Sequence, residues 1–130
     1  MLVVDDDAET SELLKVSLGA DGYRVSCVKD GRDALNFLRS HAETCIVLLD
    51  LMLPTMDGQQ FRAAQLRDRS LAWIPVVVMS GRIDAAEKAR ACAARAFLAK
   101  PLDLDQVRGT LRNIGCCHAK PRGGARAARL

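Results

Sequence analysis

Residues 45–58 read CIVLLDLMLPTMDG. The apolar run Ile46–Leu49 stops at an acid, Asp50, and a short turn-like stretch then leads to Asp57 and Gly58. A continuous apolar run, as opposed to one that alternates with polar residues, is typical of a parallel strand that is covered on both faces. These residues therefore predict a buried strand with a carboxylate at its end, followed by a loop and a helix.

Strand-like and helix-like segments alternate along the rest of the chain. Strand candidates lie at residues 2–4, 23–28, 45–49, 74–80 and 96–100. Helix candidates lie at residues 8–20, 31–40, 58–68, 84–95, with Asp84 as a candidate N-cap, and 103–114. The spacing of these units is that of crossover connections between parallel strands. Right-handed crossovers then predict an α/β fold, a three-layer sandwich with a parallel sheet in the middle.

The bulk composition fits one domain without a membrane span. The chain has 130 residues, of which 49% are hydrophobic, enough for one apolar core. No apolar run approaches the roughly 20 residues that cross a bilayer. The first residues lack the basic start and the small-residue cleavage site of a signal peptide. We therefore expect a cytoplasmic protein.

The net charge of +3 is unevenly distributed. Residues 1–115 hold 15 basic and 16 acidic residues, whereas residues 116–130 hold four basic residues and no acid. A near-neutral body argues against a nucleic-acid-binding domain. We therefore expect one domain over residues 1–115, a basic disordered tail over residues 116–130, and no DNA-binding domain in this chain.

Charged and hydroxyl residues stand where the predicted strands end. Asp5–Asp7 follow the first strand, Asp50 ends the third, Ser80 ends the fourth and Lys100 ends the fifth. In an open parallel sheet, the carboxyl ends of the strands form the edge at which ligands bind. We therefore expect these side chains to meet at one edge of the sheet.

The chemistry of that set fits a phosphoryl site. Asp5, Asp6 and Asp50 would repel one another, and Mg²⁺ relieves such repulsion because it binds carboxylates together with water and phosphate oxygens. Lys100 adds a cation for phosphate, and Ser80 adds a hydroxyl donor. Such sites work by positioning and charge neutralisation. Asp7 is not needed in this set, and we expect it to start the first helix as a cap.

Four segments resemble the receiver domain of two-component response regulators, the family of the chemotaxis regulator. They are LVVDDD (2–7), CIVLLDLMLPTMDG (45–58), IPVVVMSG (74–81) and AFLAKPLDLDQV (96–107). Each is short, but their order and spacing are specific, and they cover residues 1 to about 115. The resemblance implies a flavodoxin-like (βα)5 fold, a three-layer sandwich with strand order 2-1-3-4-5.

The resemblance also implies a phosphorylation site. Asp50 would be the phosphoacceptor, and it would take a phosphoryl group from a sensor histidine kinase or a phosphotransfer protein. Asp6, Asp50 and the backbone carbonyl of Met52 would bind Mg²⁺ or Mn²⁺ directly, and Asp5 would do so through water. The protein would be a phosphorelay switch and not an enzyme, beyond self-catalysed phosphorylation and dephosphorylation.

Further residues would transmit the signal. Lys100 and Ser80 would bind the phosphoryl group, and Phe97 would be the aromatic residue that moves with Ser80. Pro101 would follow a cis peptide bond. The resemblance places the contact with a downstream protein on the face formed by residues 84–114, and it allows a receiver homodimer.

Met52 bears on the lifetime of the phosphoryl group and on one alternative function. Its side chain has no acid or amide that could orient an attacking water, so we expect a long-lived phosphoryl group. A metal-dependent phosphohydrolase with an Asp nucleophile typically has a second Asp two residues later, where this chain has Met52. A binding module that works without phosphorylation is the other alternative, and the complete set of acids, serine and lysine argues against it.

Overall fold

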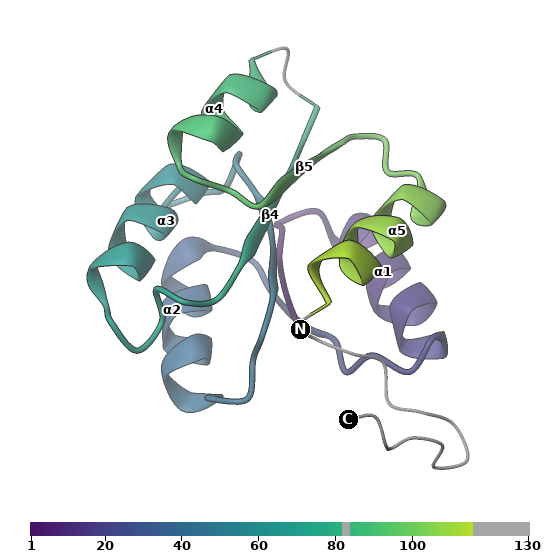
Figure 1. Cartoon of the computed structure of the whole chain (residues 1–130), viewed down its shortest axis with the longest axis horizontal. Helices are drawn as coiled ribbons and strands as arrows, with labels where there is room; N and C mark the ends of the chain where they lie inside the picture. Colours follow the sequence, from purple (N-terminus) through teal and green to yellow (C-terminus); the bar gives the residue numbers. More distant parts are fainter. Residues whose placement is uncertain (82–83, 116–130) are drawn as a thin grey trace.

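The computed structural model describes residues 1–81 and 84–115 (Figure 1). Its strands are β1 (Leu2–Val4), β2 (Ser26–Val28), β3 (Val47–Asp50), β4 (Val76–Ser80) and β5 (Ala96–Ala99). Its helices are α1 (Ala8–Ala20), α2 (Gly31–Ser40), α3 (Gly58–Arg67), α4 (Ala85–Ala91) and α5 (Leu104–Ile114). Strand and helix alternate five times, as the sequence predicts. The predicted tail, residues 116–130, lies outside the described residues.

The five strands form one parallel sheet in the order β2-β1-β3-β4-β5. Helices α1 and α5 cover one face of the sheet, and α2, α3 and α4 cover the other (Figure 1). The predicted flavodoxin-like three-layer sandwich is therefore confirmed. Because all strands run in the same direction, the ends of β1, β3 and β4 lie at the same edge.

Strand side chains alternate between two apolar cores. Leu2, Val4 and Leu49 pack on the side of α2, α3 and α4, whereas Val3 and Leu48 pack on the side of α1 and α5. These strand residues are fully buried. Burial on both faces explains why the strands appear in the sequence as continuous apolar runs.

Strand β2 is shorter than the predicted strand at residues 23–28. Only Ser26–Val28 pair with a neighbour, because β1 offers only Leu2–Val4 as partners. Tyr23 and Val25 instead contribute partly buried side chains to the core under α1 and α5. The length of an edge strand is thus set by its neighbour, which the local sequence does not reveal.

Helix α4 is also shorter than the predicted helix at residues 84–95. It ends at Ala91 because Ala93 adopts a φ of 57° and the backbone N–H of Ala94 donates to the carbonyl of Ala89 at 2.9 Å. Such left-handed helix ends usually carry glycine, so the alanines gave no stop signal. Asp84 precedes the helix as its N-cap but makes no capping hydrogen bond with its side chain.

A buried arginine ties α3 to the end of α4. Arg62 is 6% exposed. Its Nε donates to the carbonyl of Cys92 at 2.9 Å, and its Nη2 donates to the carbonyl of Ala93 at 3.0 Å. Burial lowers the pKa of Arg62. Carbonyl oxygens, and not a carboxylate, therefore satisfy this buried cation.

Gln65 extends the network to the segment before β4. It is fully buried, and its Oε1 accepts from Nη1 of Arg62 at 2.8 Å. Its Nε2 donates to the carbonyls of Leu71 and Ile74 at 2.9 and 3.0 Å. The pair thus connects α3 with two segments that follow it in the chain.

Within the described ranges, none of the helices combines the length and the apolar character that crossing a membrane requires.

The network predicts a large cost for removing the guanidinium group. Arg62→Met keeps an unbranched side chain but leaves one buried and two partly buried acceptors without donors, so we expect the free energy of unfolding to fall by about 1–3 kcal/mol. Urea denaturation of the two proteins measures this difference. The exposed Arg69→Met is the control, and it should change stability by no more than about 0.5 kcal/mol. Equal effects of the two substitutions would contradict the structural role of Arg62.

Candidate functional site

A lysine bridges two carboxylates at the edge of the sheet. Lys100 follows β5, Asp5 follows β1 and Asp50 ends β3. The Lys100 Nζ lies 2.7 Å from Oδ2 of Asp5 and 3.0 Å from Oδ2 of Asp50. Both aspartates are buried, at 1% and 6% exposure. One ammonium group thus joins strand ends that lie far apart in the sequence.

A third carboxylate completes an acidic cluster. One carboxylate oxygen each from Asp5, Asp6 and Asp50 lies within 4.8 Å of the other two. The side chain of Asp6 is exposed, whereas Asp5 and Asp50 are buried. A single ammonium group cannot balance three carboxylates. The donor set, all oxygen and close together, fits a hard divalent cation such as Mg²⁺.

Backbone amides orient the two buried carboxylates. Oδ1 of Asp5 accepts from the N–H of Asp7 at 2.9 Å, and Oδ1 of Asp50 accepts from the N–H of Met52 at 2.9 Å. In both residues the other oxygen, Oδ2, contacts Lys100. Each carboxylate is therefore held in one orientation by the residue two positions later in its own chain segment.

The pKa values of Asp50 and Lys100 are both raised, but for different reasons. Burial raises the pKa of Asp50; the hydrogen bonds from the Met52 amide and from Lys100 lower it only in part, and the negative charge of Asp5 raises it further. Burial alone would lower the pKa of Lys100, but its hydrogen bonds to Asp5 and Asp50 outweigh burial and raise the pKa. The lysine is therefore fully charged at neutral pH, and the ionised form of Asp50 is disfavoured.

Asp7 has a separate, structural role. It is the N-cap of α1, and its carboxylate accepts from the N–H of Glu9 at 3.1 Å and from the hydroxyl of Thr10 at 2.8 Å. The hydrogen bond from Thr10 is the main reason that the pKa of Asp7 is lowered. The predicted division of the three acids, two for the site and one for the helix, is therefore confirmed for Asp7.

Ser80 and Phe97 lie on neighbouring strands. Ser80 is buried at the end of β4, and its backbone carbonyl accepts from the N–H of Lys100 at 3.1 Å. Phe97 is half-buried in β5 and packs against the core on the side of α2, α3 and α4. The peptide bond between Lys100 and Pro101 is cis.

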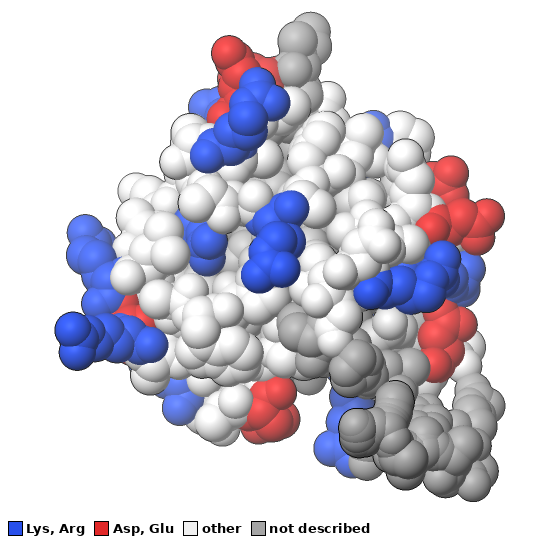
Figure 2. Space-filling view, in the orientation of Figure 1, with Lys and Arg blue, Asp and Glu red and all other residues white. Residues whose placement is uncertain are grey.

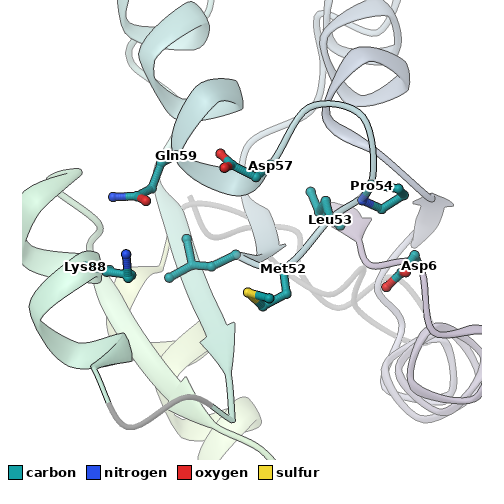
Figure 3. Close-up of a pocket in the computed structure, with 8 residues that line it drawn as sticks. Asp6, Met52, Leu53, Pro54, Asp57, Gln59 and Lys88 are labelled. Carbon is teal, nitrogen blue, oxygen red and sulfur yellow. The ribbon is translucent and has the colours of Figure 1, made fainter.

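A hollow opens between the acidic cluster and α4 (Figure 3). Its volume is about 560 Å³, and its lining residues are Asp6, Leu51, Met52, Leu53, Pro54, Asp57, Gln59 and Lys88. The Met52 side chain is 53% exposed and lies in the middle of the view, between Asp6 and Lys88. Gln59 and Lys88 were not among the predicted site residues, because nothing distinguishes them from ordinary exposed helix residues.

Glycine at position 58 lets α3 start close to Asp50. A Cβ atom at this position would lie 2.8 Å from the Cα of Leu51 and 2.9 Å from the carbonyl oxygen of Asp50. Both distances are shorter than carbon contacts allow. The N–H of Gly58 also donates to the carbonyl of Leu51 at 3.2 Å. The loop after Asp50 therefore folds back against the end of β3, which carries the Asp50 carboxylate.

Known proteins are similar to this chain in sequence and in fold. A family model described as the response regulator receiver domain matches residues 1–112. Response regulator MprA of Mycolicibacterium vanbaalenii is 35% identical over 116 residues, which make up 88% of this chain and 49% of that protein. Response regulator MprA of Mycobacterium avium is 34% identical over 116 residues, 88% of this chain and 50% of that protein. The chain spans about half the length of the curated relatives it matches.

Solved structures of response regulators have a similar fold. The receiver domain of Francisella response regulator 1452 has a TM-score of 0.71 and 27% identity, and the match covers 87% of this chain and 92% of that one. The chemotaxis response regulator CheY4 of Vibrio cholerae has a TM-score of 0.79 over 87% of this chain and 95% of that one, but at 24% identity it supports the fold alone. From the family model, the relatives and the fold together, this chain belongs to the response regulator receiver domains of two-component systems.

Proposed function

We propose that Asp50 accepts a phosphoryl group from the phosphohistidine of a sensor kinase or a phosphotransfer protein. The observation that carries the proposal is the placement of the Asp50 carboxylate beside the Lys100 ammonium and within the cluster of Asp5 and Asp6. Pairing a nucleophilic carboxylate with a cation and further acids serves phosphoryl transfer, because it combines a nucleophile with charge neutralisation.

The phosphoryl transfer needs only Asp50 and the donor phosphohistidine as reactants. A carboxylate oxygen of Asp50 attacks phosphorus, and the P–N bond of the donor phosphohistidine breaks. The bonding electron pair stays on the nitrogen. Because the other ring nitrogen of the donor carries a proton, the ring leaves as neutral imidazole, and Asp50 becomes an acyl phosphate. Lys100, already 3.0 Å from the carboxylate, binds a phosphoryl oxygen, and the hydroxyl of Ser80 donates to another.

Asp5, Asp6, Asp50 and the backbone carbonyl of Met52 would hold Mg²⁺ or Mn²⁺ in this proposal. When bound, the cation supplies positive charge for the phosphoryl oxygens. Asp5 and Asp50 already have one oxygen each fixed by a backbone amide, so they meet a cation in a defined orientation. Asp6, which is exposed, is the carboxylate that solvent and cation reach most directly.

The modified domain would act as a switch in the cytoplasm. A phosphoryl group adds about two negative charges at neutral pH, which changes the balance around Lys100 and Ser80. Movement of Ser80 and Phe97 would pass this change to residues 84–114, the proposed face for a downstream protein or for a second receiver. Phe97 has no hydroxyl, so its signal would depend on packing.

Intact-mass measurement tests the phosphoacceptor. The protein is incubated with Mg²⁺ and the small phosphodonor acetyl phosphate, and wild type should gain the mass of one phosphoryl group. Asp50→Asn should gain none, because the amide is not a nucleophile under these conditions.

A wild-type protein without adduct, under conditions that label another receiver domain in parallel, would refute the proposal. Asp57→Asn is the matched control, since Asp57 caps α3 and should be dispensable for labelling. Turnover of an added phosphate ester by wild type would instead favour the phosphohydrolase.

The lifetime of the phosphoryl group tests the role of Met52. Its exposed side chain has no group that orients water, so Met52→Asn should shorten the dephosphorylation half-time about tenfold. The decay of the labelled mass after removal of the donor gives this half-time. Met52→Leu, which stays apolar, should decay like wild type. A wild-type half-time equal to or shorter than that of Met52→Asn would disprove the role assigned to this position.

A further inference from the structure

A basic groove runs between α2 and α3, on a different part of the surface from the acidic cluster. Two adjoining hollows of about 410 and 590 Å³ form it, and both are lined by Ala64 and Arg67. The first also contains Arg32, Thr55, Met56, Gln60 and Ala63. The second also contains Arg39, Asp68 and Arg69. The lining of the groove thus contains four arginines and a single carboxylate.

That carboxylate is already engaged. Oδ1 of Asp68 accepts from the N–H and the hydroxyl of Ser70 at 3.0 and 2.6 Å, and Oδ2 lies 3.6 Å from Nε of Arg39. Within residues 1–81 and 84–115, Arg32, Arg67 and Arg69 form no salt bridge with a carboxylate. Three guanidinium groups in the groove are therefore available to an anion.

Helix stability accounts for only part of this charge. Arg39 and Arg67 lie in the last turns of α2 and α3, where a cation stabilises the helix. Arg32, however, is the second residue of α2, where a cation is unfavourable because of the positive end of the helix dipole. Arg69 lies beyond the end of α3. The folding of these helices therefore does not explain Arg32 or Arg69.

The groove is shaped for a chain that lies along it. Ala63 and Ala64 provide small side chains between the arginines, and each helix runs for ten residues, or about 15 Å. In Figure 2, blue side chains gather at the left side of the molecule, where α2 and α3 lie in Figure 1, with little red among them. One end of the groove is the loop that follows Asp50, through Thr55 and Met56.

We infer that this groove binds an acidic segment of a partner protein, with carboxylates spaced along about 15 Å. Arginine forms bidentate hydrogen bonds with carboxylates, and such pairs provide specificity and fast association. The inference goes beyond the proposed phosphoacceptor function and does not depend on it.

Nucleic acid is disfavoured by the charge around the groove. Apart from the groove residues, residues 1–115 hold 11 basic and 15 acidic residues. A long polyanion that extends past the groove would meet this acidic excess. A short acidic segment would contact the arginines alone.

The test is a titration of the ¹⁵N-labelled full chain with a peptide of alternating Glu and Ala, about twelve residues long. Amide shifts should concentrate in residues 31–40 and 55–69. The matching peptide of Gln and Ala should not bind. Arg67→Glu/Arg69→Glu should weaken binding about tenfold or more. Arg24→Glu/Arg112→Glu is the matched control, since it also reverses the charge of one loop residue and of one residue in the last turn of a helix. This control should change the affinity for the peptide less than about twofold.

Arg32→Gln separates binding from folding. It removes an unfavourable cation from the start of α2, so stability should stay equal or rise, yet peptide affinity should fall severalfold. Equal losses in the two double variants, amide shifts concentrated outside residues 31–40 and 55–69, or absence of peptide binding would overturn the inference. Tighter binding of a single-stranded oligonucleotide in the same groove would assign it to nucleic acid instead, and self-association that the groove variants abolish would assign it to a second copy of this chain.

Discussion

The Lys100 ammonium group, bonded to Asp5 and Asp50 at once, is the contact on which this site depends. The parallel sheet brings the ends of β1 and β3 together and thereby places two buried carboxylates side by side. Without a cation between them, each would raise the free energy of the other's ionised form. Lys100 reaches them from the end of β5, past the intervening strand β4. Fold and site are thus linked, because the topology that buries the strands also creates the repulsion that the lysine relieves.

The positive charge of Lys100 does not neutralise the whole acidic cluster, and the remaining negative charge determines what the site can bind. Asp6 adds a third carboxylate in the same cluster, so one ammonium group leaves excess negative charge that a divalent cation can neutralise. Backbone amides hold the far oxygens of Asp5 and Asp50, which leaves Oδ2 of each to meet cations. The close approach of Gly58 to Asp50 fixes the loop that carries Met52. A preorganised cluster of this kind needs little rearrangement to bind a charged group.

The sequence allowed the fold and most of the cluster to be predicted for identifiable reasons. Continuous apolar runs indicated strands buried on both faces, and acids at their ends had to meet at one edge. Contacts between distant segments could not be predicted in this way. The end of α4 at Ala91 depends on an alanine, Ala93, in a conformation that usually requires glycine. Arg62 and Gln65 are polar residues one helical turn apart, and only the tertiary structure shows that both point inward, to carbonyls of later segments.

Urea unfolding of wild type and Asp50→Asn, each with and without saturating Mg²⁺, tests the central claim that excess negative charge defines this site. Without Mg²⁺, Asp50→Asn should be the more stable protein, because it removes one of three clustered carboxylates while Lys100 keeps Asp5 as a partner. Mg²⁺ should raise the free energy of unfolding of wild type, because it binds the folded state, and should raise that of Asp50→Asn much less. A less stable Asp50→Asn without Mg²⁺, together with an equal gain from Mg²⁺ in both proteins, would contradict the account.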